Sequence, residues 1–121
     1  MIEKRDFYIN GAWVAPAQAR DCEVIDPAIE EAVAVISLGD QADTDAAVAA
    51  AKAALPGWAA LMPQQRAEYC AGILDQYRKR EGEMAEAIRA EMGAPIKLAR
   101  ESQAPCLPWH LQNFLTAVDQ I

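Results

Sequence analysis

The sequence has no hydrophobic run long enough to cross a membrane, and it has few basic residues. Its longest apolar stretches, around residues 46–51, are far shorter than the roughly 20 residues of a membrane-spanning helix. The 11 lysines and arginines are outnumbered by 18 aspartates and glutamates, which gives a formal net charge of −7. This acidic balance argues against nucleic acid or an anionic membrane surface as a partner, because both carry negative charge.

Cysteine and glycine are scarce as well. The three cysteines, Cys22, Cys70 and Cys106, are odd in number and widely spaced, so they indicate a reducing compartment rather than a disulfide framework. The first six residues lack the apolar segment of a signal peptide, and we therefore expect a cytoplasmic location. The six glycines are scattered and form neither Gly-x-Gly-x-x-Gly nor a P-loop, so no phosphate-binding loop is predicted.

The chain changes character once: residues 1–38 are strand-like and residues 40–121 are helical. In residues 7–14, two apolar arms flank Asn10-Gly11, the dipeptide best suited to a type I′ hairpin turn. A second hairpin is predicted from residues 22–25 and 32–38, joined by a turn around Asp26-Pro27.

The first helix is expected to begin after Asp40 and to end near Leu55. Asp40 is a suitable N-cap, because its carboxylate can accept a hydrogen bond from a free backbone N–H of the first turn. Pro56-Gly57 is predicted to stop this helix and to leave Trp58 in the connection that follows.

The later helices are predicted from the positions of proline and glycine. Pro63 suits the first turn of a second helix, Gly82 is expected to separate it from a third, and Gly93 is expected to end the third. A fourth helical segment begins at Pro95, and Pro105 and Pro108 should kink it or divide it in two. The sequence thus predicts two β-hairpins followed by four or five α-helices.

Cys106 and His110 are the most suggestive candidates for chemistry, because one helical turn separates them and could bring a thiolate to an imidazole. Pro108 is predicted to disrupt that turn, and no acidic residue stands at helical spacing to orient the ring. Two ligands are also fewer than a zinc site needs. We expect this pair to be structural or exposed, and Cys22 and Cys70 to act as small hydrophobic residues.

Neighbouring carboxylates occur at Glu30-Glu31, at Asp43 and Asp45, and at Glu81, Glu83 and Glu86. The last group is predicted near a helix start, where the helix dipole favours negative charge without a catalytic role. All three groups are expected on solvated faces. The sequence therefore predicts no catalytic, cofactor-binding or metal-binding residue in this chain.

The order of short motifs resembles that of the NAD(P)-dependent aldehyde dehydrogenases. That family opens with an aromatic-Ile-Asn/Gly-Gly-x-Trp hairpin, as in residues 8–13, and a short strand with an Asn-Pro turn follows it. The motifs Asp43-x-Asp45-x-Ala47-Val48-x-x-Ala51, Trp58, Arg66-Ala67 and Glu91-x-Gly93-x-Pro95 then come in the family's order and at similar spacing. The resemblance covers nearly all of residues 7–121.

Several positions depart from the family pattern. Asp26 replaces the usual Asn, Ile29-Glu30 replaces the usual Thr-Gly, and Ala94 replaces the usual Lys. Since Glu30 takes the place of a turn glycine, the loop is expected to be shaped differently.

The resemblance implies an α/β fold in which residues 1–121 are the N-terminal part of the cofactor-binding domain, beside a Rossmann-like sheet. In the family, the catalytic Cys, the Glu base, the Asn of the oxyanion hole and the cofactor loops lie further along the chain. The resemblance therefore implies a fragment, with the remainder of the fold and further copies of the enzyme as partners, and with NAD or NADP as the cofactor of the parent enzyme. Some members bind a monovalent cation through backbone carbonyls at positions matching Ile25 and Glu91.

Two functions remain open from the sequence. The first is the N-terminal scaffold of an enzyme that oxidises an aldehyde to a carboxylic acid with NAD(P)⁺, in which case the 121-residue chain is expected to be inactive alone. The second is a non-catalytic α+β interaction module or an inactive truncated remnant. Both predict a large exposed apolar surface if the chain ends at Ile121.

Overall fold

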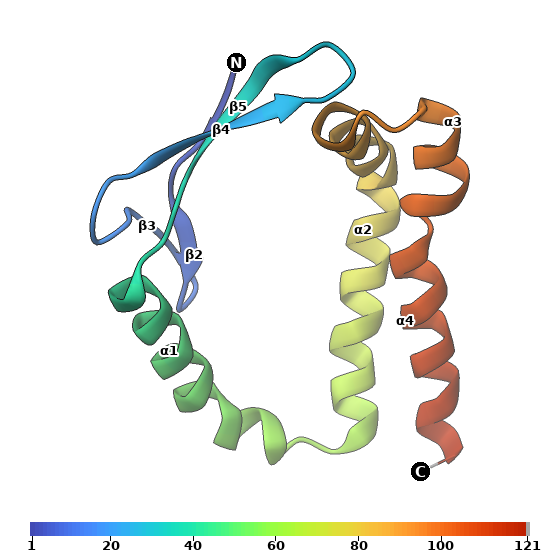
Figure 1. Cartoon of the computed structure of the whole chain (residues 1–121). Helices are drawn as coiled ribbons and strands as arrows, with labels where there is room; N and C mark the ends of the chain where they lie inside the picture. The colour runs from blue at the N-terminus through green and yellow to red at the C-terminus, as the bar shows by residue number, and fades with distance from the viewer. Residues whose placement is uncertain (121) are drawn as a thin grey trace. The chain divides into compact units, whose positions relative to one another are not determined.

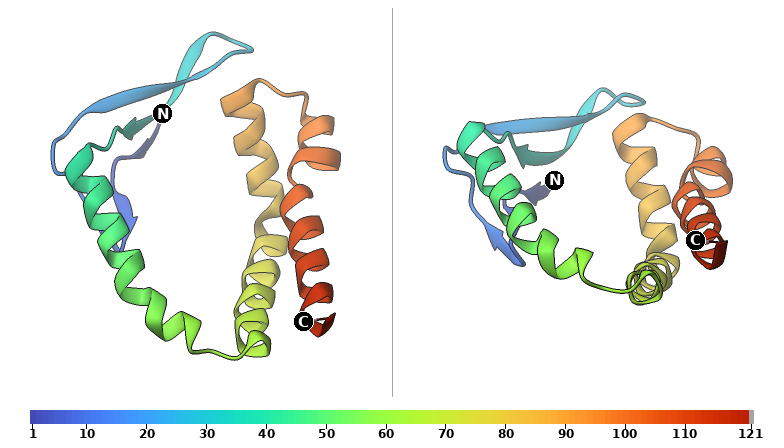
Figure 2. Two further views of the ribbon diagram at one scale, coloured as in Figure 1. Left: turned by 60° about the horizontal axis from the view of Figure 1, so that its bottom comes forward. Right: turned by 90° about the horizontal axis from the view of Figure 1, so that it is seen from below.

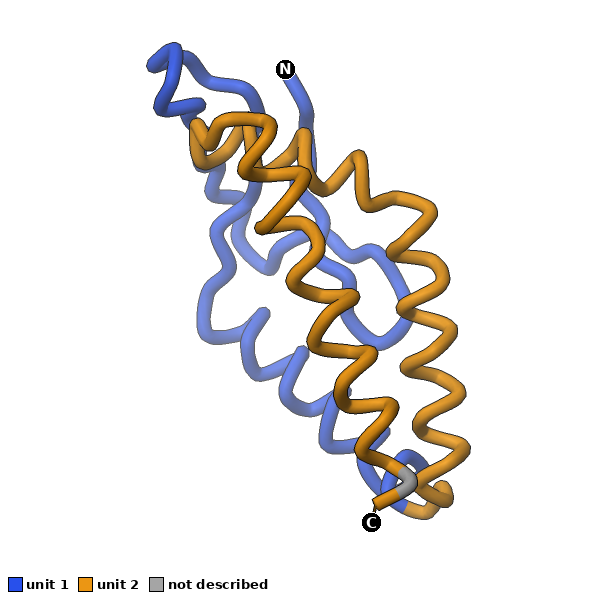
Figure 3. Tube along the Cα trace, turned by 90° about the vertical axis from the view of Figure 1, so that its right-hand side faces the viewer, with its two compact units in different colours: residues 1–59 blue, residues 60–121 orange. Residues whose placement is uncertain are grey.

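The computed structural model describes residues 1–120, apart from the side chain of Asp119. The chain divides into two compact units, Met1–Ala59 and Ala60–Ile121 (Figure 3). All five strands of the described residues lie in the first unit together with helix α1 (Gln41–Ala59), and the other helices lie in the second. The division into units thus falls after α1, whereas the change from strands to helices falls near residue 39.

The first hairpin is confirmed. Strands β2 (Phe7–Ile9) and β3 (Ala12–Val14) are antiparallel, and both turn residues have positive φ, 53° at Asn10 and 79° at Gly11. The rings of Tyr8 and Trp13 face each other across the two strands with centroids 5.2 Å apart. Phe7 is half-buried and lies against Gly39, where an added Cβ would come within 3.5 Å of the Phe7 ring.

The second hairpin is also confirmed, and it is part of a three-stranded sheet. Strands β4 (Asp21–Asp26) and β5 (Glu31–Ser37) pair antiparallel, and strand β1 (Ile2–Lys4) pairs parallel to β5 on its other edge (Figure 1). The sequence did not predict β1. Its partner residues lie 32 positions along the chain, so no local pattern marks the pairing.

Helix α1 begins as predicted but does not end as predicted. The Asp40 carboxylate accepts hydrogen bonds from the N–H groups of Ala42 and Asp43, at 2.8 and 3.2 Å, so Asp40 is the N-cap. The helix continues through Pro56 to Ala59, and the stop predicted at Pro56-Gly57 is wrong. Because Pro56 lies in the last turn, it removes only the hydrogen bond to the Lys52 carbonyl, at an exposed position where water can replace it.

Helix α2 (Pro63–Met92) is one continuous helix, and the break predicted at Gly82 is wrong. A glycine inside a helix costs only about 1 kcal/mol relative to alanine. Leu74 before it and Ala85 after it are both buried, so packing on either side of Gly82 offsets that cost. The helix ends where Gly93 adopts the left-handed conformation, with φ of 64°, which confirms the predicted stop.

The final segment is divided as predicted. It consists of a short turn α3 (Ile96–Leu98), a π-helical stretch η1 (Ala99–Gln103), helix α4 (Cys106–Ala117) and a final 3₁₀ turn η2 (Val118–Gln120). Helices α2 and α4 lie side by side and antiparallel (Figures 1 and 2). Among the described residues, only α1, α2 and α4 are α-helices longer than one turn, so the expectation of four or five helices is corrected to three, with α3 as a short turn.

The core of the second unit consists of small residues. Ala85 on α2, Ala99 at the start of η1 and Ala104 after η1 are each at most 1% exposed, and Ile88 and Ile96 pack against them. Alanine side chains allow the backbone of η1 to approach α2 closely. The core therefore lies where the π-helical stretch meets α2.

Large apolar side chains remain exposed over both units. Of the described residues, five apolar ones are buried, and three of these are alanines. Trp13, Trp109 and Phe114 are each more than 60% exposed. Contiguous exposed apolar surface marks sites of contact with other protein. None of the helices described here combines the length and the apolar character of a membrane span.

Candidate functional site

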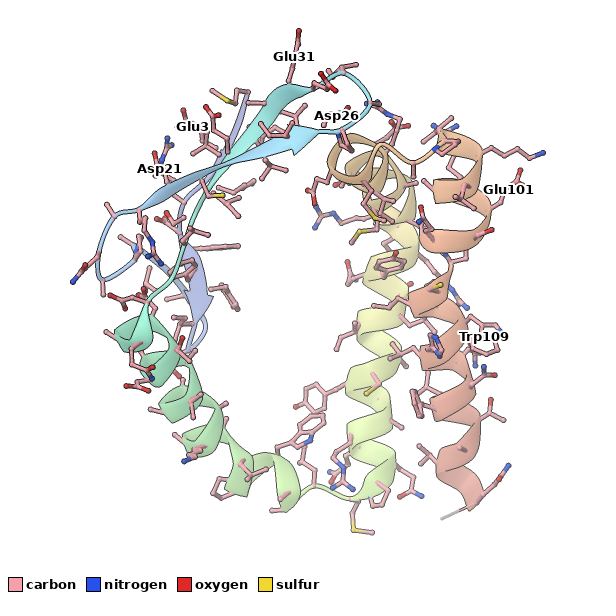
Figure 4. The ribbon with its side chains drawn as sticks, viewed as in Figure 1. Glu3, Asp21, Asp26, Glu31, Glu101 and Trp109 are labelled. Atoms are coloured by element: carbon pink, nitrogen blue, oxygen red, sulfur yellow. The ribbon has the colours of Figure 1, made fainter. Side chains whose placement is uncertain are left out.

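Cys106 and His110 lie one turn apart on α4, but they are not joined by a hydrogen bond that could form a catalytic pair. The Cys106 thiol lies 3.3 Å from the backbone carbonyl of Ser102, to which it donates. The His110 ring instead meets the ring of Trp109 edge-on, with centroids 4.7 Å apart. Both residues of the pair are exposed, and Trp109 projects from α4 on the side away from α2 (Figure 4).

The predicted disruption of this turn by Pro108 is wrong. Pro108 is the third residue of α4, in the first turn, where a backbone N–H has no partner inside the helix. The helix therefore accepts Pro108 without a break. The break lies earlier, at Ala104 and Pro105, between η1 and α4.

A tyrosine hydroxyl completes the hydrogen bonding at this junction. The carbonyl of Ala104 would pair with the N–H of Pro108 in a regular helix, but proline has none. Tyr77 of α2 donates its hydroxyl to this carbonyl at 2.7 Å. Burial raises the pKa of the Tyr77 hydroxyl, and the nearby Glu81 and Cys106 act in the same direction. The sequence did not predict this contact, because its helical pattern places Tyr77 on an apolar helix face.

Cys22 and Cys70 lie at half-buried positions, on β4 and α2. The Cys22 thiol is 3.6 Å from the carbonyl of the adjacent Glu23, a weak contact. Neither thiol has a histidine or a basic group among the contacts that the structure gives it. Both cysteines are thus placed as small side chains at packing positions.

The carboxylates of Asp40 and Asp43 act on the backbone rather than on a ligand. Asp43 accepts hydrogen bonds from the N–H of Ala17 at 2.9 Å and from the N–H of Asp40 at 3.0 Å. These two hydrogen bonds lower the pKa of Asp43, and the bond from Ala17 has the larger effect. Arg20 strengthens the same junction by donating to the Gly39 carbonyl at 3.0 Å. This explains why α1 belongs to the strand-containing unit.

The acidic group on α2 lies in the middle of the helix and not near a helix start, so the dipole explanation predicted for it is wrong. Glu83 pairs with Arg80 at 2.8 Å, and Glu86 pairs with Arg89 at 3.2 Å and with Arg100 of η1 at 2.8 Å. These arginines lower the pKa values of both glutamates. The pairs are solvent-exposed and are typical of a charged outer helix face.

An open hollow of about 340 Å³ lies in the first unit, between β1 and the first hairpin. Its lining residues are Glu3, Lys4, Arg5, Asp6 and Trp13. The Arg5 guanidinium is already engaged, because it pairs with Glu3 at 2.6 Å and with Asp21 of β4 at 3.1 Å. Glu3 and Asp21 can be located in Figure 4. None of these lining residues is a cysteine, a serine or a histidine.

The turn between β4 and β5 adapts to the residues that depart from the family pattern. The buried Asp26 accepts a hydrogen bond from the N–H of Ala28 at 2.8 Å, the geometry of an Asx turn. Glu30 adopts a positive φ of 60°, which is the conformation a glycine would take at no cost. The loop thus keeps a left-handed residue although it has no glycine.

The positions matched to a cation site in the family lie in different units. Ile25 is part of β4, next to an irregularity in the pairing with β5, and Glu91 is in the last turn of α2. Among the side chains that the structure describes, no three from His, Cys, Asp or Glu are grouped closely enough to hold a metal ion. The polar groups described above cap helices, close turns and pair charges, and they do not converge on a position where a substrate atom could react.

Comparison with known proteins defines the family. The sequence model of the aldehyde dehydrogenase family matches residues 13–121. The chain therefore belongs to the aldehyde dehydrogenase family.

Individual relatives agree with this assignment. The chain is 44% identical over 118 residues to a 3-succinoylsemialdehyde-pyridine dehydrogenase of a Pseudomonas species, covering 97% of this chain and 24% of that protein. An aldehyde dehydrogenase from Bartonella henselae has 45% identity and a TM-score of 0.97 over 100% of this chain and 25% of its own. Aldehyde dehydrogenase C of Pseudomonas syringae, in complex with NAD⁺ and octanal, has 40% identity and a TM-score of 0.92 over 95% of this chain and 24% of its own. The chain thus spans about a quarter of the length of these relatives.

Proposed function

We propose that this chain is the N-terminal part of the cofactor-binding domain of an enzyme that oxidises an aldehyde to a carboxylic acid with NAD⁺ or NADP⁺. The observation that carries this proposal is the match of the whole chain, at a TM-score of 0.97, to one quarter of an aldehyde dehydrogenase. The complex of the Pseudomonas syringae relative with NAD⁺ and octanal supports the reaction class. The substrate-bearing and nucleotide-bearing parts of such an enzyme belong to the remaining three quarters of the fold.

In this role the residues of the chain position backbone and do not perform chemistry. Asp40 caps the start of α1, Asp43 holds that start to the segment between the hairpins, and Tyr77 holds the start of α4 to α2. Cys106, the most exposed of the three cysteines, donates to a carbonyl of the preceding turn, and no hydrogen bond joins its thiol to His110. We propose accordingly that none of the three cysteines is the nucleophile.

The direct test is NADH formation, measured by absorbance at 340 nm, with the purified 121-residue protein, NAD⁺ or NADP⁺, and octanal or a semialdehyde. The unsubstituted aldehyde dehydrogenase C of Pseudomonas syringae is the positive control, since the solved complex is of a cysteine-to-alanine mutant. We expect no aldehyde-dependent signal above that of a buffer blank. Turnover that survives Cys106→Ser would contradict the assignment of the chain as scaffold, and turnover abolished by this substitution would identify an unexpected nucleophile.

The exposed apolar side chains also favour a second function, an interaction module without catalysis. The two functions differ in what the gene encodes after residue 121. A continuing reading frame with a Gly-rich strand–helix turn and a later cysteine would support the enzyme, and a stop codon would support the module. In the enzyme, we propose the remainder of the fold and further copies of the same chain as partners, and a cytoplasmic location on the basis of the few, unpaired cysteines.

A further inference from the structure

No further inference is drawn: the strongest candidate, the exposed apolar stripe of α1 formed by Val48, Ala51 and Leu55, carries nothing because no contact within residues 1–120 shows what covers it.

Discussion

Substituting Tyr77 by Phe removes one hydroxyl and keeps the ring. The hydroxyl donates to the carbonyl of Ala104 at 2.7 Å, and Ala104 is only 1% exposed. The usual donor in a helix, the N–H four residues later, is absent because that residue is Pro108. Tyr77→Phe therefore leaves a buried carbonyl with no donor, and we expect a loss of about 2 kcal/mol in the free energy of unfolding.

A double-mutant cycle with Pro108→Ala tests this reasoning. Alanine at position 108 restores the missing N–H in the first turn of α4, so the Ala104 carbonyl gains a donor of its own. In the Pro108→Ala protein, Tyr77→Phe is expected to cost at least about 1 kcal/mol less than in the natural sequence. Urea unfolding followed by circular dichroism at 222 nm measures the four proteins. Equal costs of Tyr77→Phe in both backgrounds would refute the coupling between Tyr77 and Pro108.

Tyr8→Phe is the matched control, because Tyr8 is 64% exposed and carries the same hydroxyl. Its effect is expected to stay within about 0.5 kcal/mol. The pH dependence gives a second check. Since the folded-state pKa of Tyr77 is raised above 10.0, its contribution is fully present below about pH 10 and is lost as the pH rises through the folded-state pKa. Tyr77→Phe should lack this alkaline loss.

Three further outcomes are expected. Gly82→Ala should stabilise α2 by about 0.5–1 kcal/mol, because an added Cβ meets no atom within 4 Å. Gly93→Ala should destabilise the protein by about 1 kcal/mol, because the φ of Gly93 is 64°. Thermal unfolding measures both effects, and a stabilising Gly93→Ala would contradict the left-handed end of α2. Asp43→Ala should accelerate amide exchange at Ala17, while a remote carboxylate change, Glu68→Gln, should not; unchanged exchange at Ala17 would exclude the bond. Because the pKa of Asp43 is lowered, its contribution to stability should be present above about pH 4 and be lost as the pH falls further. Amide exchange at Ala17, corrected for its intrinsic pH dependence, should therefore rise below about pH 4 in the natural sequence but not in Asp43→Ala. Finally, the isolated chain should bind the dye ANS and self-associate in gel filtration with light scattering, and a monomer that binds no dye would be incompatible with the exposed side chains.

Features that depend on two or three neighbouring residues were predictable from the sequence. Asn10-Gly11 forms the predicted turn because both residues accept positive φ, and Gly93 ends α2 for the same reason. Asp40 caps α1 because its side chain reaches the N–H groups two and three residues later. The order of such local motifs also identified the family, because each motif is short but their spacing along the chain is preserved.

The candidate site was predictable only in part. The spacing of Cys106 and His110 placed them correctly on one helix, but their actual partners, Ser102 and Trp109, are set by side-chain rotamers that the spacing does not determine. The acidic group on α2 was misjudged because its interpretation depended on a helix boundary at Gly82. A glycine only lowers the local preference for a helix, and the packing of Leu74 and Ala85 outweighs it.

The amino-acid sequence by itself determined the turns, the helix caps, the acidic charge and the family, since these depend on local backbone preference or on residue identity. Only the tertiary structure decided that β1 pairs with β5, that α2 continues through Gly82, and that Tyr77 donates to Ala104. Each of these depends on a contact between residues distant in sequence or on a burial energy that exceeds a local penalty of about 1 kcal/mol. A sequence pattern shows the local free-energy cost of a residue such as Gly82 in a helix, and the packed structure shows the contacts that offset this cost.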